Sequence, residues 1–550
     1  MLFLLLLEGL AAAQLVSFLQ QDSLCARCME SAAVLTQTFF SQSLQDSEAQ
    51  VIEDFCGSAL DPYVCRKVGE TVGRSGLKAL YSRYWKPESL CTDAGLCSSH
   101  SSPATGQFYI PEVPLTPRPN HVNPGASDVR ILVLSDIHLD LAYEPGSEVN
   151  CNQPLCCRPV YTHWENITVA AGHWGAPAAC DLPRWTLEAA LEGAKALKPD
   201  LILWLGDTSP HDLWNYRPDL QNRDVRMVAE IIREKMEGVP VYPAIGNHEC
   251  FPSDQFMPGA EAGLLESLAE AWEPWLSPES RAQFLQNGFY HSRDAGSGLH
   301  ILALNTQMAD TMNFFIAGQG QDPGYMLEWA ETVLEQVEYM GEFAILIGHI
   351  PPGDHFTDSS WARLYQRLST RFQRTIKGHF YAHTHNAQFY VIQDYTSPGK
   401  AAGVIFACPS LTTYTGHEPS LRLMEMGRET GEVRSLRDFA FPLERANEVG
   451  AEWESSGLWQ SFDAISYYGL SDLSPQSWFS LSLSLFSPQA FSLYWLCFNY
   501  GRSPPCDSNC MKRTACETQF SVYDDMLGCS KVATWDLLYL AAERVFGLGK

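Results

Sequence analysis

Positively charged residues are scarce in this sequence. Its 550 residues include 37 Lys and Arg against 64 Asp and Glu, which gives a net charge of -27 at pH 7. Nucleic-acid binding needs clustered Lys and Arg, so we expect no nucleic-acid partner. An acidic protein is repelled by anionic membranes at neutral pH, and the sequence pI of about 4.9 means that this repulsion weakens near pH 5. The charge therefore favours work in an acidic compartment, although many cytosolic proteins are equally acidic.

An uninterrupted apolar run long enough to span a bilayer is also missing. The most apolar region near the C-terminus has no charged residue between Asp472 and Arg502, but serines and Pro488 interrupt it. A membrane-spanning helix needs about 20 mostly apolar residues. We therefore expect residues 436–550 to form a mainly helical region with disulfides, whose helices pack against the rest of the protein. A surface that docks on lipid is the alternative.

The N-terminus lacks the positive charges that open most secretory signals. Residues 1–20 nevertheless begin with MLFLLLLEGLAAAQ, in which small residues follow an apolar run that Glu8 interrupts. Such a pattern resembles the later part of a signal peptide, with the alanines as a cleavage region. A short buried helix is the alternative interpretation.

Cysteine, by contrast, is abundant, and many of its 17 copies are clustered. Six lie between 25 and 97, four between 151 and 180, and four between 506 and 529. Clusters of this kind indicate disulfide loops formed in an oxidising compartment, so we expect a lysosomal or secreted protein. The odd total leaves at least one thiol free or paired between chains. A glycosylation sequon at Asn166 fits such a location but is close to chance frequency.

Cysteines also bound the first expected domain, residues 21–98. Cys25 and Cys28 form a CxxC pair, but no histidine follows until His100, so a helical disulfide module is favoured over a zinc site. Residues 99–128 contain six prolines and should form a linker. Residues 129–435 alternate apolar runs with helical patterns, which predicts a layered α/β domain with buried sheets. Its helices are expected at 181–198, 221–237, 262–286 and 324–340.

Polar side chains follow five of the predicted strands. LSDIHLD carries Asp136 and His138, LGDTSPHD carries Asp207 and His211, GNHE carries Asn247 and His248, IGHIPPG carries His349, and FYAHTHN carries His383 and His385. Any one of them alone is better explained as a turn residue, a helix cap or an ordinary histidine. Five strand ends together point to a cation, because charged and imidazole groups are costly to bury without compensation.

Two of these pairs are separated by one residue. Alternate residues of an extended chain face the same side, so Asp136 and His138 should aim at one point, and so should His383 and His385. The set offers oxygen and nitrogen ligands without a thiolate, and about seven groups are too many for one tetrahedral ion. Two metals that share a carboxylate fit better; Zn, Mn or Fe would suit, and a secretory pathway favours Zn. Such a pair activates water and clamps phosphoryl oxygens, which predicts phosphate-ester hydrolysis without a covalent intermediate.

The five motifs, in this order, resemble the calcineurin-like metallophosphoesterase family. The family pattern is D-x-H, G-D, G-N-H-[DE], G-H and G-H-x-H, and this chain has SDIH, LGD, GNHE, IGH and AHTH within residues 129–430. GDTSPHDLW, AWEPWL, GHIPPG and PSLTTYTG, with the order of the expected domains, resemble the sphingomyelinase branch of the family. That branch implies a saposin-like module at 21–98, a two-sheet α/β sandwich at 129–435, and hydrolysis of sphingomyelin to ceramide and phosphocholine at acidic pH. We expect a monomer that acts peripherally on sphingomyelin in membranes, at an anionic lipid surface.

The resemblance also implies roles for individual residues. One zinc ion would be held by Asp136, His138, Asp207 and His385. Asp207 would bridge to a second zinc ion, held also by Asn247, His349 and His383. His248 and His211 match the catalytic histidines, which would give a proton to the leaving alcohol and stabilise charge on the phosphate. Glu249 is expected to orient a neighbouring histidine or to cap the following turn.

The same resemblance implies the disulfides Cys25–Cys97, Cys28–Cys91, Cys56–Cys65, Cys151–Cys156, Cys157–Cys180, Cys506–Cys510 and Cys516–Cys529. Some positions depart from the pattern. Ala382 stands where the family usually has Gly, and Ala309 and His355 replace two cysteines that the sphingomyelinase branch joins beside the site. Cys250 and Cys408 are extra, and we hypothesise that they pair, which leaves Cys497 as the free thiol.

Two other functions stay open at this point. A secreted phosphodiesterase acting on nucleotides or other soluble esters would have nearly the same catalytic motifs, but its relatives lack the six-cysteine module. A non-enzymatic lipid-binding protein with a relic metal site is the other alternative, although no member of the ligand set is missing. Recognition of choline is also open, and Tyr414 is one of many aromatic residues that could contribute to a cation cage.

Overall fold

The computed structural model describes residues 29, 62–69, 128–316, 319–453, 459–499 and 504–530. The chain divides into two compact units, residues 1–107 and 108–550. The first unit has one described helix, α4 (Pro62–Val68). Each disulfide predicted for this unit includes at least one cysteine outside the described residues, so the module at 21–98 stays a prediction.

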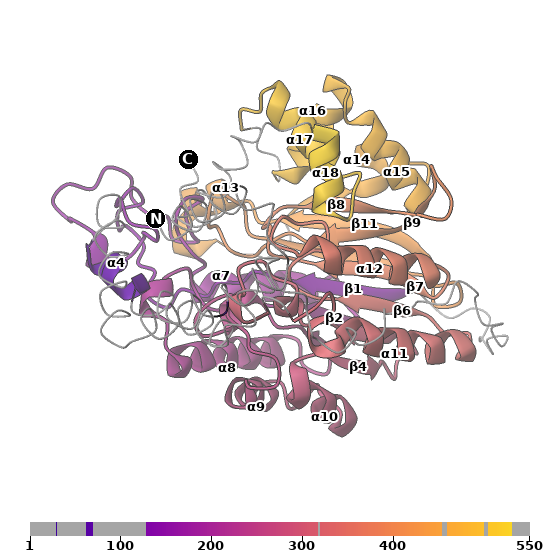
Figure 1. The fold of residues 1–550 in the computed structure, drawn as a ribbon. Coiled ribbons are helices and arrows are strands. Elements are labelled where there is room, and N and C mark those ends of the chain that lie inside the picture. The colour runs from indigo at the N-terminus through magenta and orange to yellow at the C-terminus, as the bar shows by residue number, and fades with distance from the viewer. Residues whose placement is uncertain are drawn as a thin grey trace. The chain divides into compact units, whose positions relative to one another are not determined.

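Two six-stranded sheets form the centre of the second unit (Figure 1). The first sheet has the order β12-β11-β10-β1-β2-β3 and the second β4-β5-β6-β7-β9-β8. The strands of the first sheet are β1 (Val129–Leu134), β2 (Leu201–Trp204), β3 (Val241–Pro243), β10 (Ser420–Met426), β11 (Val433–Ala440) and β12 (Gln460–Asp463). Those of the second are β4 (Tyr290–Arg293), β5 (His300–Ala303), β6 (Ala344–Ile347), β7 (Ile376–Tyr381), β8 (Gln388–Gln393) and β9 (Ala401–Ala407). The predicted two-sheet α/β architecture is confirmed.

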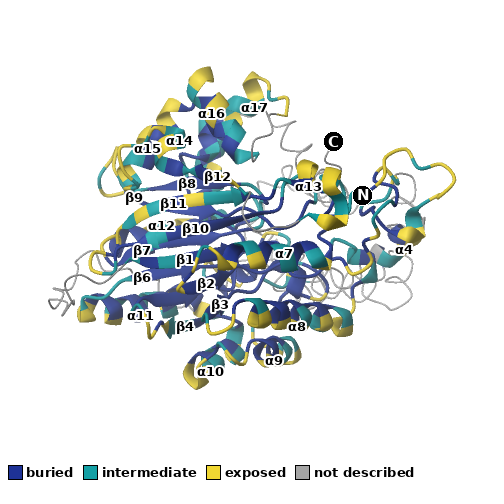
Figure 2. Ribbon diagram, turned by 180° about the vertical axis from the view of Figure 1, so that it is seen from behind, coloured by how far each residue is buried: buried dark blue, intermediate teal, exposed yellow. Residues whose placement is uncertain are grey.

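Parallel strands at the middle of each sheet explain the continuous apolar runs of the sequence. β1 pairs in parallel with β2, with Leu132 opposite Ile202, and β5 pairs in parallel with β6. Strands covered on both faces need apolar residues at every position, as in LILW and AILI. One cluster of buried residues includes members of both sheets, and Figure 2 shows these strands buried.

The helices of this part are α7 (Arg184–Lys195), α8 (Pro218–Lys235), α9 (Ala262–Ala271), α10 (Pro278–Asn287), α11 (Met326–Met340), α12 (Ser359–Arg371) and α13 (Leu443–Val449). Predicted positions are confirmed for α7, α8 and α11, whereas α12 and α13 were not predicted. The single helix predicted over 262–286 is wrong, because Pro274 cannot continue a helix. A second helix starts at Pro278, where the side chain of Ser277 accepts the backbone N–H of Ser280.

The C-terminal region is helical and packs on the second sheet, as the sequence predicted. Its helices are α14 (Ala464–Tyr468), α15 (Pro475–Ser484), α16 (Pro488–Phe498), α17 (Ser508–Glu517) and α18 (Tyr523–Ser530). Trp478 of α15 lies 4.8 Å from Phe389 and 5.1 Å from Phe406, measured between ring centroids. Among the described helices, none is long and apolar enough to cross a membrane. The first sheet continues past residue 435, the expected end of the catalytic domain, into β11 and β12.

The second unit contains all four disulfides that the resemblance implied for it. They are Cys151–Cys156, Cys157–Cys180, Cys506–Cys510 and Cys516–Cys529. The hypothesised Cys250–Cys408 bridge is wrong, since both thiols are free and buried, as is Cys497. Sγ of Cys250 lies 3.9 Å from the carbonyl oxygen of Gly246, whereas Sγ of Cys408 lies 3.7 Å from the guanidinium of Arg422. Each thiol is therefore packed in its own surroundings.

Candidate metal centre

The predicted site residues meet at strand ends of both sheets. In the first sheet, β1 is followed by Asp136 and His138, β2 by Asp207, and β3 by a short 3-10 turn at Asn247–Glu249. In the second sheet, β6 is followed by His349, and β7 by His383 and His385. Carboxyl ends of parallel strands are where open α/β sheets commonly bind ligands. The contacts below connect all of the predicted metal and catalytic residues.

The backbone at these strand ends is not extended. Positive φ angles occur at Asp136 (46°), His138 (41°), Asp207 (58°), His383 (69°) and His385 (59°). The reason given for the expected convergence, alternation along an extended chain, is therefore wrong, and His383 and His385 belong to different groups of potential ligands. A left-handed conformation is unfavourable for residues with side chains and persists only where surrounding contacts hold it. The strained positions are the ones that aim the ligand side chains.

Two glycines let the Asp207 loop and the Asn247 turn approach closely. A Cβ at Gly206, where φ is +90°, would lie 2.4 Å from the backbone nitrogen of Gly246. A Cβ at Gly246 would lie 2.2 Å from Oδ1 of Asp207. Any larger residue would push the two loops apart, which explains the glycines of LGD and GNHE.

Asp207 is the centre of the cluster. Its Oδ2 lies 3.1 Å from Nε2 of His349, 3.5 Å from Nε2 of His138 and 3.9 Å from Nε2 of His248. Its Oδ1 accepts the backbone N–H of His248 at 2.9 Å. Burial opposes ionisation, but the attraction of His349 and His248 holds the pKa of Asp207 well below its usual range. A charged carboxylate that faces several imidazoles offers an oxygen ligand to a divalent cation.

His138 and His349 are oriented in the same way. Nδ1 of His138 lies 2.8 Å from the carbonyl oxygen of Ser209, and Nδ1 of His349 lies 2.8 Å from that of Leu205. A carbonyl only accepts, so each Nδ1 donates and each Nε2 faces Asp207. Both Nε2 atoms are buried without a hydrogen-bond partner within the described part of the chain. Imidazoles oriented by a second hydrogen bond are typical metal ligands, so these residues fit a divalent cation.

Asp136 and Asn247 add oxygen atoms to the cluster. Oδ1 of Asp136 lies 3.7 Å from Nε2 of His385 and accepts the backbone N–H of His383 at 3.1 Å. Oδ1 of Asn247 lies 3.1 Å from Nδ1 of His383. Burial disfavours a charge on His349, but Asp207 and Asp136 raise its pKa to about 10. The site therefore stabilises positive charge, as a cation site must.

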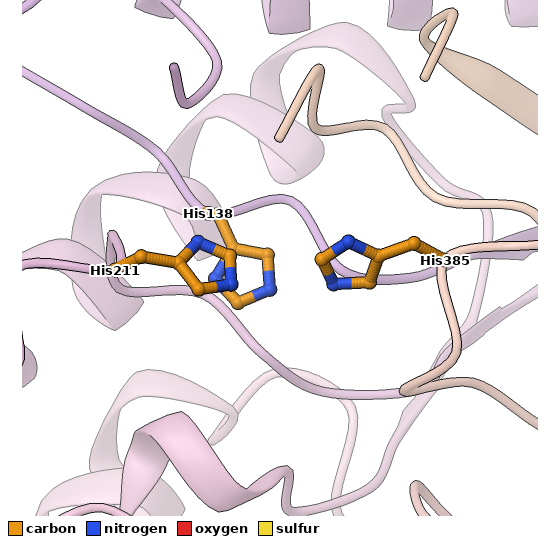
Figure 3. A group of neighbouring side chains, drawn as sticks. All are labelled: His138, His211 and His385. Atoms are coloured by element: carbon orange, nitrogen blue, oxygen red, sulfur yellow. The ribbon is translucent and has the colours of Figure 1, made fainter. Parts of the chain in front are cut away.

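Among the described residues, potential ligand atoms form three overlapping groups, and the atoms within each group lie 4.8 Å or less from one another. The groups are His138, His211 and His385; His138, Asp207 and His248; and Asp207, His349 and His383. Figure 3 shows the first group, with the three rings gathered around a common space. His211, predicted to be catalytic, thus lies close enough to His138 and His385 to serve as a ligand.

His211 is held by Asp181, which the sequence analysis missed. Oδ1 of Asp181 lies 2.8 Å from Nδ1 of His211, and Oδ2 accepts its backbone N–H at 2.6 Å. The imidazole also stacks on Tyr414, with ring centroids 3.7 Å apart and planes 9° from parallel. One face of Tyr414 is therefore covered by His211. Asp181 lies outside the five strand-end motifs, so no pattern in the sequence marks it.

His248 is held by Tyr216, another residue that the sequence analysis missed. The Tyr216 hydroxyl donates to the carbonyl of Pro210 at 2.7 Å and is also bonded to Nδ1 of His248. With its one proton directed to Pro210, the hydroxyl accepts from Nδ1, and Nε2 faces Asp207. Burial lowers the pKa of His248 to about 4, against the attraction of Asp207.

Glu249 joins two loops instead of orienting a histidine. One carboxylate oxygen accepts the N–H groups of Gly246 at 2.7 Å and of Asp207 at 3.0 Å, and the other accepts that of Thr208 at 2.8 Å. The prediction of a histidine partner or of a cap on the following turn is therefore wrong. Glu249 fixes the backbone of Asp207 against its own turn.

The two loops that lack the family disulfide are joined by backbone hydrogen bonds. The N–H of Thr311 donates to the carbonyl of Phe356, and the N–H of Asp358 donates to that of Ala309, both at 2.7 Å. They form a short antiparallel bridge centred on Asp310 and Thr357. The loops thus lie side by side without a covalent bond.

Ala382 is the other departure from the family pattern. It is not among the residues with positive φ, so a Cβ causes no backbone strain there. Its N–H donates to the carbonyl of His349 at 2.7 Å. Alanine therefore keeps the adjoining His383 connected to the end of β6.

Comparisons with known proteins agree with this geometry. Residues 129–387 match the calcineurin-like phosphoesterase family. A sphingomyelin phosphodiesterase of Bos taurus is 34% identical over 410 residues, which cover 72% of this chain and 64% of that protein. The Homo sapiens sphingomyelin phosphodiesterase is 34% identical over 403 residues, which cover 70% of this chain and 63% of that protein.

A third relative matches over more of its own length. Sphingomyelin phosphodiesterase 1 of Caenorhabditis elegans is 30% identical over 417 residues, which cover 74% of this chain and 72% of that protein. The chain spans slightly less than two thirds of the bovine and human relatives. The chain belongs to the sphingomyelin phosphodiesterase family of calcineurin-like phosphoesterases.

Proposed function

We propose that this protein hydrolyses the phosphodiester of sphingomyelin to ceramide and phosphocholine at acidic pH, using two zinc ions. The observation that carries the proposal is the buried carboxylate of Asp207, faced by Nε2 of His138 and of His349 from two strand ends. The names of the related proteins supply the substrate.

The ligand assignment follows the groups around Asp207. Asp136, His138, Asp207 and His385 would hold one zinc ion, and Asp207, Asn247, His349 and His383 the other. The oxygen and nitrogen donors, without a thiolate, suit zinc in a site that does redox-neutral chemistry. Zinc ions bound there would lower the pKa of a water and neutralise charge on the phosphate.

The protein's own groups would handle the leaving alcohol. His248 donates from Nδ1 to Tyr216, so its Nε2 carries a proton only in the imidazolium form. That form would pass the Nε2 proton to the leaving oxygen in the space beside Asp207. His211 is fixed by Asp181 next to His138 and can hold charge developing on the phosphate. Both imidazoles are oriented before substrate arrives, which is what proton transfer requires.

The net charge and the disulfides indicate the compartment in which this reaction would take place. The net charge of -27 would fade in an acidic compartment, which lets the chain approach anionic membranes peripherally as a monomer. The four disulfides described in the second unit and an exposed Asn166 in a glycosylation sequon support a lysosomal or secreted location. The saposin-like module at 21–98 would then contact the lipid.

A substrate panel tests the proposal. The full chain is assayed on sphingomyelin in anionic liposomes and on ATP and bis-p-nitrophenyl phosphate, at pH 5 and 7.4, with and without chelator. We expect liposomal sphingomyelin at pH 5 to be the best substrate, and chelator to abolish the activity. Preference for the soluble esters would show that the protein is a phosphodiesterase of soluble substrates. If no substrate is hydrolysed, a non-enzymatic lipid-binding function is favoured.

A further inference from the structure

A cavity of about 290 Å³ lies beside His383. Its walls come from the loop after β6, from β8 and from the C-terminal helices. They include Asp354, Phe356, His383, Tyr390, Glu517 and Tyr523. Glu517 is the last residue of α17, and Tyr523 is the first of α18. The C-terminal region therefore helps to form a space that reaches one of the proposed zinc ligands.

Two carboxylates and two imidazoles line this cavity. They belong to Asp354, Glu517, His355 and His383, and no Lys or Arg lines it among the described residues. Asp354 is 6% exposed and accepts the backbone N–H of Phe356 at 2.8 Å. Burial opposes its charge, but His355, 3.2 Å away, holds the pKa of Asp354 well below its usual range. The charge of Asp354 is therefore built into the wall.

Glu517 adds a second carboxylate at the C-terminal side. Its Oε2 accepts from the side chain of Gln388 at 3.3 Å. Nε of Arg513 lies 3.8 Å from Oε1, but Arg513 does not line the cavity. Burial raises the pKa of Glu517, against the attraction of Arg513 and His355, so its carboxylate is fully charged only above the usual range of a glutamate.

Aromatic rings complete the walls. Phe356, Tyr390, Phe498 and Tyr523 all line the cavity. Asn386 lines it too, and its Oδ1 is buried with no hydrogen-bond partner in the described residues. A trimethylammonium group donates no hydrogen bond and is recognised by ring faces, carboxylates and carbonyl-type oxygens. The walls match that chemistry.

The cavity adjoins only one of the ligand groups. The ring of His383 lies 5.3 Å from His349 and 5.1 Å from Phe356, which lines the cavity. His211 and His248 lie instead beside His138, at 3.9 Å and 4.6 Å between centroids. A phosphodiester bound at Asp207 would therefore extend one substituent toward His211 and His248, and the other toward the cavity.

We propose that this cavity binds the cationic ammonium headgroup that remains on the phosphate after hydrolysis. Asp354 and Glu517 supply the negative charge, and the aromatic rings supply the faces. The inference rests on the proposed hydrolysis of a choline phosphodiester and makes Glu517 a specificity-determining residue. The leaving alcohol then lies on the side of His248, the proposed proton donor.

A pair of soluble substrates isolates the positive charge. One is p-nitrophenyl phosphocholine, and the other is p-nitrophenyl 3,3-dimethylbutyl phosphate, in which carbon replaces the quaternary nitrogen. Both release the same p-nitrophenol, so they differ only in the headgroup. With the zinc-loaded full chain, we expect kcat/KM to be about tenfold higher for the choline ester, most of it through KM.

Glu517→Gln removes the charge and retains an oxygen that can accept from Gln388. We expect the ratio of the two kcat/KM values to fall about tenfold in Glu517→Gln and in Asp354→Asn. The matched control is Glu230→Gln, the same change on an exposed position of α8, which should keep the wild-type ratio. Because Asp354 is buried, Glu517→Gln carries the test if Asp354→Asn fails to fold.

Equal rates on the two esters in wild type, or an unchanged ratio in Glu517→Gln, would overturn the proposal. A preference for a nucleotide ester that Glu517→Gln abolishes would also overturn it and assign the cavity to a base. If neither ester is hydrolysed, the proposed function falls, and titration calorimetry with phosphocholine then judges the cavity. Weaker phosphocholine binding by Glu517→Gln than by Glu230→Gln would support the headgroup site, and equal binding would exclude it.

Discussion

His138 and His349 face Asp207 from two sides with the same arrangement, Nδ1 on a backbone carbonyl and Nε2 toward the carboxylate. Beyond His138 the site is crowded with His211 and His248, and each is bonded to a further polar side chain. On the other side of His349 lies His383, which lines a cavity.

The different surroundings of His138 and His349 suit two different tasks, proton transfer and substrate binding. On the His138 side, imidazoles with fixed partners can hold and pass protons. On the His349 side, open space with charged and aromatic walls can hold part of a substrate. The surroundings of His138 and His349 therefore differ, although both histidines face Asp207 in the same way.

The largest effect should follow from removing the residue that the two sides share. Asp207→Asn keeps the shape but loses the charge that attracts cations from both sides. We expect metal content to fall and kcat/KM on a soluble phosphodiester to drop by at least about 10³-fold. Elemental analysis and kinetics measure this, with Asp219→Asn as the exposed control, its side chain 67% accessible. If Asp207→Asn kept the wild-type metal content and activity, neither the His138 side nor the His349 side would depend on the charge of Asp207.

Removing one histidine from each side should give different losses. His349→Ala should lose metal and activity together, because His349 is a proposed ligand. His248→Ala should keep its metal and lose about 10²–10⁴-fold in kcat, the usual contribution of a proton donor. Loss of metal from His248→Ala, or undiminished turnover, would contradict its assignment. The same measurements on His211→Ala decide whether it acts as a ligand or on the phosphate.

A smaller effect should come from the support of His248. Tyr216→Phe removes the hydroxyl that accepts from Nδ1 of His248 but keeps the ring. We expect kcat to fall about fivefold, with a shifted pH profile and unchanged metal content, because one hydrogen bond is worth about 1 kcal/mol. Tyr325→Phe, at an exposed ring, is the control. A fall in metal content or melting temperature without a change in the pH profile would make the role of Tyr216 purely structural.

The smallest expected effect concerns the stability of the fold, through two histidines, His291 and His300, that lie outside the metal centre. Nε2 of His291 lies 2.8 Å from Nδ1 of His300, and burial together with His300 lowers the pKa of His291 to about 4. The unfolded chain takes up this proton below about pH 6.5, whereas the folded chain does so only near pH 4. His291 thus contributes stability that is complete above pH 6.5 and is lost as the pH falls toward 4.

His291→Gln should therefore reduce the drop in melting temperature between pH 7.5 and pH 4.5, without affecting metal content. His163→Gln, at an exposed position, is the control and should leave the drop unchanged. Identical drops in wild type and His291→Gln would show that the pair does not titrate as inferred. A change in metal content would show that these histidines are coupled to the site after all.

The sequence located the clustered Asp and His residues but not the residues that hold them. Strand-end motifs mark Asp136, Asp207 and His349 because a buried apolar run stops where these polar residues begin. Asp181 and Tyr216 have no such signal, since they reach His211 and His248 from loops whose positions only the fold determines. Their roles depend on contacts between segments that are distant along the chain.

Backbone geometry set another limit. β11 has charged residues such as Arg437 and Asp438 along it, so no continuous apolar run marks it in the sequence. The left-handed φ angles at His383 and His385 could not be inferred either, because a non-glycine residue adopts them only under tertiary constraint. The wrong Cys250–Cys408 pair has the same origin, since elimination among leftover cysteines says nothing about distance.

The backbone bridge between Asp310 and Thr357 affects how the site responds to reducing conditions. Where the related enzymes are expected to rely on a covalent link, this loop pair is joined by bonds that no thiol reagent can cut. Phe356, which lines the headgroup cavity, accepts one of those bonds. Reduction would thus open the loops at Cys157–Cys180 or Cys516–Cys529 while leaving this edge of the cavity insensitive to redox conditions.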